Sequence, residues 1–232
     1  MLPGLTRRCV AEALGTALLL ATVVGSGIMA QRLCGGNIAI ALLANTIATG
    51  AALVALIGTF GSISGAHFNP AVSIADAMQG GLPWLEVPAY AGSQIAGAIV
   101  GVIAANTMFG LSAISLSTRV RSGPAQLFSE FIATFGLMTV IWGCVRYRSD
   151  FVPFAVGAYI TAAYWFTAST SFANPAVTIA RSLSDTFAGI RPLDATGFII
   201  VQLLGAISAT ALFAWLAPIQ KKEAQAEMVP HG

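Results

Sequence analysis

The sequence has few charged residues. Aspartate, glutamate, lysine and arginine together make up 9% of its 232 residues, whereas 56% of the residues are hydrophobic. A soluble domain carries about 25% charged residues, so this chain lacks the charge that a water-facing surface needs. The net charge is only +2, and no basic patch is interleaved with aromatic residues, so we expect no nucleic-acid partner. The composition predicts a polytopic membrane protein whose partner is the lipid bilayer.

Histidine and cysteine are scarce as well. The two histidines, His67 and His231, offer no Ser/His/Asp set and no cluster of metal ligands, so we expect no enzyme activity, no metal and no cofactor. Cys9 and Cys34 flank the first long apolar segment and would lie about 35 Å apart along a helix, too far for a disulfide. The cysteines are therefore interpreted as passive thiols.

Long apolar segments are abundant. A helix needs about 20 apolar residues to cross about 30 Å of hydrocarbon. Six segments approach this requirement: 9–30, 37–60, 84–107, 126–145, 152–168 and 196–217. They predict six transmembrane helices in a cell (inner or plasma) membrane. With both termini on the inner side of the membrane, six basic residues lie on that side and five on the outer side. This weak bias places both termini in the cytoplasm.

One motif occurs twice, as Asn69-Pro70-Ala71-Val72 and as Asn174-Pro175-Ala176-Val177. Asparagine caps free backbone N–H groups and proline is favoured at the first helical position, so each copy predicts a helix N-terminus. Only about ten helix-compatible residues follow each copy, which is about 15 Å and half a membrane. The motifs therefore predict two half-helices whose N-termini, with their partial positive charges, meet at the waist of a pore.

The motifs lie at matching places in two similar halves, residues 7–110 and 124–218. Each half has a glutamate in its first apolar segment and a glutamine in its last: Glu12 and Gln94, then Glu130 and Gln202. Three spans per half is an odd number, so the second half must be inverted relative to the first. The predicted fold is an all-α polytopic membrane protein with six transmembrane helices and two re-entrant half-helices. We expect one channel domain over residues 1–232, with a short polar tail at 219–232.

These features resemble the aquaporin and aquaglyceroporin (major intrinsic protein) family over nearly the whole chain. The resemblance is carried by Ala11-Glu12, Gly15-Thr16, the segment Ser64–Val72, Gln94, Glu130, Asn174-Pro175-Ala176 and Gln202. It implies six tilted helices and two half-helices around a narrow pore, in a homotetramer. It also implies that Asn69 and Asn174 present amides to passing solutes, while the two helix N-termini repel cations and interrupt proton hopping.

In this family the pore is narrow at the two asparagines and again at a selectivity filter of four residues. Counting sequence offsets from the two motifs predicts the four filter residues of this chain. They are Thr49, Ala162, Ser171 and Val177. Most members have arginine where this chain has Val177, so the resemblance implies a wider, uncharged selectivity filter. The valine and the segment Tyr164–Val177 resemble bacterial aquaglyceroporins found beside arsenic-resistance genes. This likeness implies passage of arsenous acid and of methylated arsenicals.

Two carboxylates and one histidine fall within the predicted membrane region. Charge is costly there. The paired placement of Glu12 and Glu130 indicates acceptors that support the re-entrant loops, rather than a proton relay. His67 lacks companion metal ligands, so a hydrogen bond within its loop is expected, with a pH gate as the alternative.

Arg181 follows Val177 by four residues, on roughly the same helix face and about 6 Å further along the axis. One hypothesis is that Arg181 supplies a positive outer vestibule in place of the missing filter arginine. The sequence favours the alternative, in which Arg181 faces lipid headgroups or pairs with Asp185 four residues later.

The sequence therefore predicts a passive channel for small uncharged solutes, namely water, glycerol-like polyols and arsenous acid. A strictly water-selective channel is the alternative. An ion-coupled secondary transporter is less favoured, because Glu12 and Glu130 are the only acids within the six apolar segments apart from Glu86, which lies at the very start of the third.

Overall fold

The computed structural model describes residues 3–218, and the predicted polar tail at 219–232 lies outside the described residues. Within the described part all regular secondary structure is helical, which confirms the predicted all-α fold. Its α-helices are α1 (Leu5–Leu33), α2 (Ile38–Ser64), α3 (Pro70–Met78), α4 (Val87–Met108), α5 (Pro124–Tyr147), α6 (Val152–Phe166), α7 (Pro175–Arg181) and α8 (Pro192–Leu216). Short 3-10 helices at Trp84–Glu86 and Ser149–Phe151 precede α4 and α6.

Each of the six predicted apolar segments forms a long helix. Five of these helices, including α4 with the 3-10 turn before it, are long and apolar enough to cross a membrane. The sixth, α6, is shorter, with 15 residues. The half-helices α3 and α7 have 9 and 7 residues, respectively, and at 1.5 Å per residue they cannot cross a bilayer.

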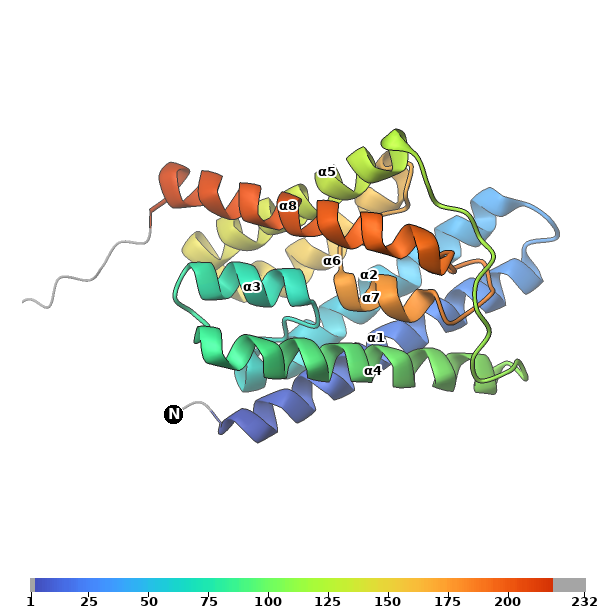
Figure 1. Cartoon of the computed structure of the whole chain (residues 1–232), viewed down its shortest axis with the longest axis horizontal. Helices are drawn as coiled ribbons and strands as arrows, with labels where there is room; N and C mark the ends of the chain where they lie inside the picture. The colour runs from blue at the N-terminus through green and yellow to red at the C-terminus, as the bar shows by residue number, and fades with distance from the viewer. Residues whose placement is uncertain (1–2, 219–232) are drawn as a thin grey trace, which may run out of the picture.

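The two halves of the chain run in opposite directions (Figure 1). The described chain begins, and α8 ends, at the same end of the molecule, which we call the terminal end. Helices α1 and α4 run away from this end. Helices α5 and α8 run back from the opposite, distal end. Between α4 and α8, the half-helices α3 and α7 lie end to end in the middle of the molecule (Figure 1). This is the predicted inverted repeat.

The closest helix pairs approach at glycine. A Cβ atom on Gly97 of α4 would lie 2.1 Å from the carbonyl oxygen of Ala13 in α1. In the second half, a Cβ atom on Gly205 of α8 would lie 2.6 Å from the carbonyl oxygen of Phe131 in α5. Small residues at such crossings let helix backbones approach within a membrane, where there is no hydrophobic force between helices.

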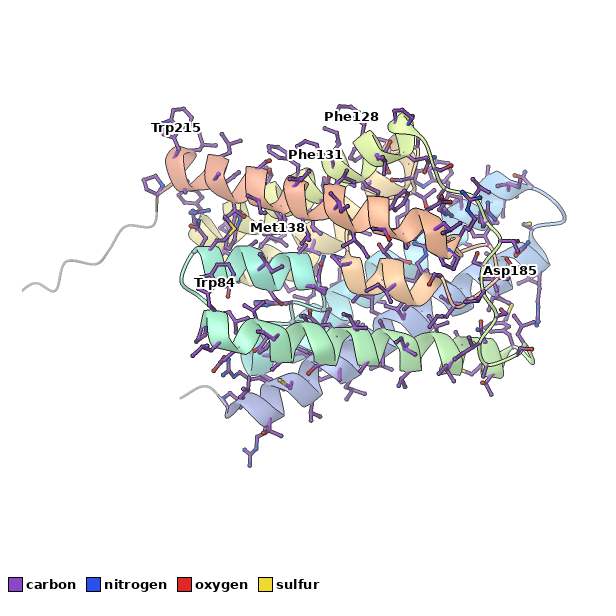
Figure 2. All side chains as sticks on the ribbon, viewed as in Figure 1. Trp84, Phe128, Phe131, Met138, Asp185 and Trp215 are labelled. Atoms are coloured by element: carbon purple, nitrogen blue, oxygen red, sulfur yellow. The ribbon has the colours of Figure 1, made fainter. Side chains whose placement is uncertain are left out.

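The outer surface is apolar along the long helices. Leu14, Phe128 and Leu204 are exposed on α1, α5 and α8, as expected of side chains that face lipid. Trp84 and Trp215 are exposed at the terminal end, while Asp185 lies at the distal end (Figure 2). Tryptophan favours the membrane–water interface, so the terminal end coincides with one bilayer surface.

Gly97→Ala tests the close approach of α1 and α4. The added methyl group would overlap backbone that cannot move independently, and overpacking of this kind costs about 1–3 kcal/mol. We expect a lower unfolding temperature for the protein purified in detergent. The matched control is Gly92→Ala on the same helix, where the new Cβ meets nothing within 4 Å. Equal unfolding temperatures for the two variants would contradict the packing described here.

Candidate functional site

Asn69 and Asn174 cap the half-helices at the point where these meet. The Oδ1 atom of Asn69 accepts a hydrogen bond from the backbone N–H of Ala71 at 2.9 Å. The Oδ1 atom of Asn174 accepts from the N–H groups of Ala176 and Val177, at 2.9 and 3.3 Å. Pro70 and Pro175 occupy the first position of each helix, where their lack of an N–H costs nothing.

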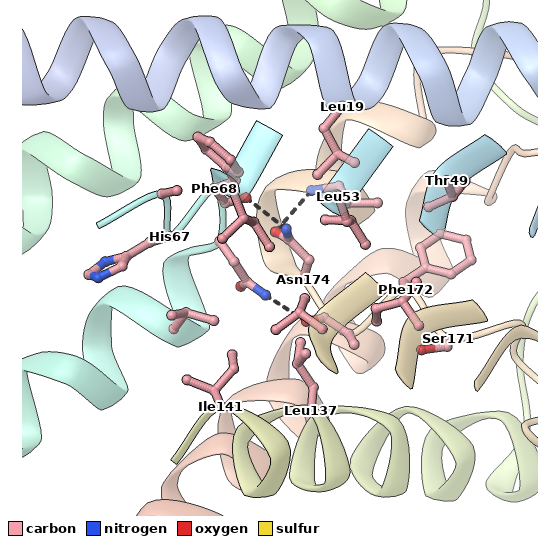
Figure 3. A pocket seen from close by; sticks show the side chains of 18 of the residues that line it. Leu19, Thr49, Leu53, His67, Phe68, Leu137, Ile141, Ser171, Phe172 and Asn174 are labelled. Atoms are coloured by element: carbon pink, nitrogen blue, oxygen red, sulfur yellow. Dashed lines mark hydrogen bonds between the residues drawn. The ribbon is translucent and has the colours of Figure 1, made fainter. Parts of the chain in front are cut away.

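The two asparagine amides also tie the halves of the chain together. Asn69 Nδ2 donates to the carbonyl oxygen of Ala173 at 2.8 Å, and Asn174 Nδ2 donates to that of Phe68 at 2.8 Å. Figure 3 draws these bonds in the middle of the cavity described below. An amide nitrogen carries two N–H groups, so each asparagine has one left for a solute.

The backbone that leads to each asparagine is unwound. Several residues other than glycine have φ between 47° and 62°, in the left-handed region: Ala66, Phe68, Thr170, Ser171 and Ala173. Left-handed backbone costs about 1–2 kcal/mol per residue for L-amino acids. It also leaves peptide groups outside any helix at membrane depth, where they need partners.

Glu12 satisfies the first unwound segment. Its fully buried carboxylate accepts from the N–H of His67 at 3.0 Å and from that of Phe68 at 2.7 Å. The hydroxyl of Ser64 donates to it at 2.6 Å and the amide of Gln94 at 2.8 Å. Four donors therefore surround one carboxylate, which offsets the cost of its burial.

Glu130 makes the equivalent contacts in the second half. Its carboxylate accepts from the N–H groups of Phe172 and Ala173, at 2.8 and 2.9 Å. The amide of Gln202 donates to it at 2.6 Å. Both oxygens are thus occupied by structural partners.

His67 lies near the terminal end of the site. Its Nδ1 atom is 3.1 Å from the hydroxyl of Ser73, a hydrogen bond across the turn into α3. Its Nε2 atom is 3.7 Å from a carboxylate oxygen of Asp76. Both His67 and Asp76 line the cavity.

A cavity of about 150 Å³ passes the two asparagines. This is about ten times the volume that a single ordered water requires. Around Asn174 its wall is apolar, formed by Leu19 and Leu53 on one side and by Leu137 and Ile141 on the other (Figure 3). The asparagine amides are therefore isolated donors in an apolar surrounding.

Three of the four predicted filter residues gather in the distal part of the cavity. Thr49, Ser171 and Val177 are buried and line its wall. The Ser171 hydroxyl is buried without a hydrogen-bond partner in the described part of the chain.

Ala162 does not lie with the other three predicted residues, and this prediction needs a correction. The side chain of Ala162 is exposed, and the buried residue of α6 at this level is Tyr164, whose hydroxyl lies 3.3 Å from Thr49 Oγ1. Helix α6 lines the cavity at four-residue intervals: Val152, Val156, Ile160 and Tyr164. Two residues correspond to about 200° around a helix, so Ala162 faces away. The four-residue spacing in the sequence would have identified Tyr164.

Arg181 is enclosed in the wall of the cavity, so neither part of the favoured sequence interpretation holds. Its side chain is 2% exposed and lies over the ring of Phe172, with 3.5 Å between the guanidinium carbon and the ring centroid. Its Nε atom donates to the carbonyl oxygen of Ala188. Asp185 instead accepts from the backbone and the hydroxyl of Thr118, at 2.9 and 3.1 Å.

Glu130→Gln tests the support of the second unwound segment. In either orientation the new amide places an NH₂ group against a backbone N–H. A buried donor left without its acceptor in this way lowers the free energy of unfolding by about 1–3 kcal/mol. We expect a clear drop in the unfolding temperature in detergent. Glu86→Gln is the control, because that carboxylate pairs with Arg8 at 2.8 Å in a partly exposed position and contributes less. A Glu130→Gln protein of normal stability that has lost proton-driven uptake would indicate a proton relay instead.

The sequence is similar to one protein family and to individual members of it. The model of the family described as Major intrinsic protein matches residues 3–171 and, in a second match, residues 147–232. Aquaglyceroporin AqpS of Rhizobium meliloti (strain 1021) is 58% identical over 212 residues, which cover 91% of each chain. Aquaporin NIP3-1 of Oryza sativa subsp. japonica is 29% identical over 216 residues, 90% of this chain and 68% of the rice protein.

A solved structure has the same fold. The X-ray structure of the aquaglyceroporin from Plasmodium falciparum matches with a TM-score of 0.69 and 22% sequence identity. The match covers 90% of this chain and 96% of the Plasmodium chain.

Proposed function

The chain belongs to the major intrinsic protein family of membrane channels, and we propose that it conducts water, glycerol-like polyols and arsenous acid passively. Methylated arsenicals are included in the proposal. The name of the relative from Rhizobium meliloti, an aquaglyceroporin, supports the polyol part of it. The observation that carries the proposal is Val177 in the cavity wall beside polar but uncharged side chains.

The distal constriction offers hydroxyl groups to a solute. Thr49 and Tyr164 contribute two, and the unpartnered hydroxyl of Ser171 contributes a third. A buried hydroxyl without a partner carries an energetic cost that a hydroxylated solute relieves. Further along, such a solute accepts from the free N–H groups of Asn69 and Asn174. Each step exchanges hydration for a protein hydrogen bond.

Cations are excluded by the arrangement of positive partial charges. The N-termini of α3 and α7 converge on the asparagines, and helix N-termini repel cations. Arg181 adds a full positive charge near the distal end of the cavity, where it forms a positive vestibule. Proton exclusion in this account depends on these groups, because Val177 takes the place of a filter arginine.

The remaining parts of the proposal concern assembly and placement. We expect a homotetramer in the cell (inner or plasma) membrane, with both termini in the cytoplasm.

Glu12 and Glu130 act as loop supports, and their occupied oxygens argue against an ion-coupled transporter. Tyr164 in the constriction favours the narrower, strictly water-selective alternative, so permeability must decide between the two.

Val177→Arg in reconstituted vesicles tests the proposal by stopped-flow permeability to water, glycerol and arsenous acid. Wild type is expected to pass all three. The variant is expected to keep its water flux and to lose glycerol and arsenous acid flux by about tenfold or more, a barrier increase of about 1.4 kcal/mol. The new guanidinium would narrow the constriction and add a charge close to Arg181.

Val177→Met separates size from charge, because it lengthens the side chain and leaves it neutral. We expect it to slow arsenous acid and glycerol less than arginine does. If wild type passes water alone, the water-selective alternative is correct. If Val177→Arg conducts all solutes as wild type does, Val177 does not form the constriction.

A further inference from the structure

A second cavity lies at the distal end, beside the first. Its volume is about 270 Å³, and Arg181 lines both cavities. Its wall combines residues of α2, of the loop between α4 and α5, of the start of α5, of the loop after α6, and of α7 with the loop that follows it. Three of its lining residues are arginines, Arg119, Arg121 and Arg181, and none of its lining residues in the described part of the chain is acidic.

The acids around these arginines have other partners. Glu130, whose charge acts on Arg121, accepts from the backbone N–H groups of Phe172 and Ala173. Asp194 accepts from Arg191 at 2.8 Å and from the backbone N–H of Arg121 at 2.9 Å, so it does not pair with the Arg121 side chain. Asp185 is bound to Thr118. Within residues 3–218 the three guanidinium groups therefore form no ion pair with a carboxylate.

Two of the guanidinium groups are held in fixed positions. Arg121 is 9% exposed, and it donates from Nε to the carbonyl oxygen of Gly189 and from Nη1 to that of Ser169, both at 2.9 Å. Its guanidinium carbon lies 5.0 Å from the centroid of the Phe172 ring, which Arg181 also covers. Two positive charges thus share one aromatic ring, and burial, with the charge of Arg181 next, lowers the pKa of Arg121. An anion between them would relieve this repulsion.

The third arginine and a glutamine complete the wall. The Arg119 guanidinium lies 5.2 Å from the ring of Phe187 and makes no side-chain hydrogen bond within the described residues. Gln126 donates to the carbonyl oxygen of Ala168 at 2.9 Å, but its Oε1 atom is buried without a partner in the described chain. The cavity therefore presents several charged donors and one unsatisfied acceptor.

We propose that this cavity is a binding site for a phosphate group, bound by Arg119, Arg121 and Arg181. The planar fork of guanidinium matches the oxygens of phosphate in a bidentate manner, which favours an oxyanion over a spherical ion. A protonated phosphate oxygen supplies the donor that Gln126 Oε1 lacks. The group is either a free inorganic phosphate or the headgroup phosphate of a lipid at this bilayer surface. Because Arg181 also lines the first cavity, an occupant bound to it lies beside the distal part of that cavity, and any effect on solute flux rests on the proposed channel function.

The test is thermal unfolding of the protein in an uncharged detergent, titrated with inorganic phosphate against chloride at constant ionic strength. Phosphate binding to the folded protein raises the unfolding temperature in a saturable manner. We expect such a rise in wild type and no comparable rise with chloride. Arg119→Gln removes one charge without removing a structural hydrogen bond. It is expected to raise the half-saturating phosphate concentration about tenfold, as loss of a charge-assisted hydrogen bond would.

Arg32→Gln is the matched control. Arg32 also stacks on an aromatic ring, at 5.2 Å from Phe109, and it does not line the cavity. It should titrate as wild type does. The proposal is overturned if phosphate and chloride act alike on wild type, or if Arg119→Gln and Arg32→Gln give the same half-saturation.

Bilayer nanodiscs distinguish the two sources of phosphate. If the site takes the free ion, wild type responds to phosphate in nanodiscs as it does in detergent. If a lipid headgroup fills the site, the response disappears in nanodiscs, and native mass spectrometry detects a bound lipid in wild type that Arg119→Gln has lost. Glycerol flux measured without phosphate tests the proposed channel function. A decrease in that flux when phosphate is added tests the phosphate site. The channel function and the phosphate site can therefore fail independently.

Discussion

The structure depends on two buried carboxylates that hold irregular backbone in the middle of a membrane protein. Glu12 and Glu130 accept four backbone hydrogen bonds between them, all from the unwound segments that lead to the half-helices. Backbone at this depth is tolerated only where its polar groups are satisfied. With these bonds in place the left-handed residues are retained, the half-helices begin at the centre, and the two asparagine amides face a shared cavity.

Under the proposed function, the same arrangement accounts for selection by charge. A neutral solute meets hydroxyl groups in the distal constriction and then two amide donors in an apolar wall, so it can exchange one hydrogen bond for the next. A cation meets two helix N-termini and the charge of Arg181, and among residues 3–218 the cavity wall has no carboxylate except Asp76 at the terminal end. The wall thus offers hydrogen-bond partners to hydroxylated neutral molecules and positive charge to cations.

Much of the fold was predictable from the sequence, because the signals were local or repeated. The length of the apolar segments predicted six spans. The capping asparagines Asn69 and Asn174, each followed by proline, predicted both half-helices. Side-chain direction was harder. Ala162 was placed by counting back from a motif across an irregular loop, and an error of two positions reverses the face of a helix. The prediction for Arg181 is wrong because it rested on local pairing with Asp185 four residues later. Tertiary contacts with Phe172 and Ala188 determine the position of the side chain instead.

The central claim is that neutral solutes move passively through the pore. The most direct test is uptake of labelled glycerol into vesicles that contain the purified protein, with and without an imposed proton gradient. The account predicts that glycerol equilibrates at a rate proportional to its concentration difference, that the proton gradient changes nothing, and that no membrane-potential-driven proton current accompanies it. Saturable accumulation of glycerol against its gradient, abolished by a protonophore, would contradict the account.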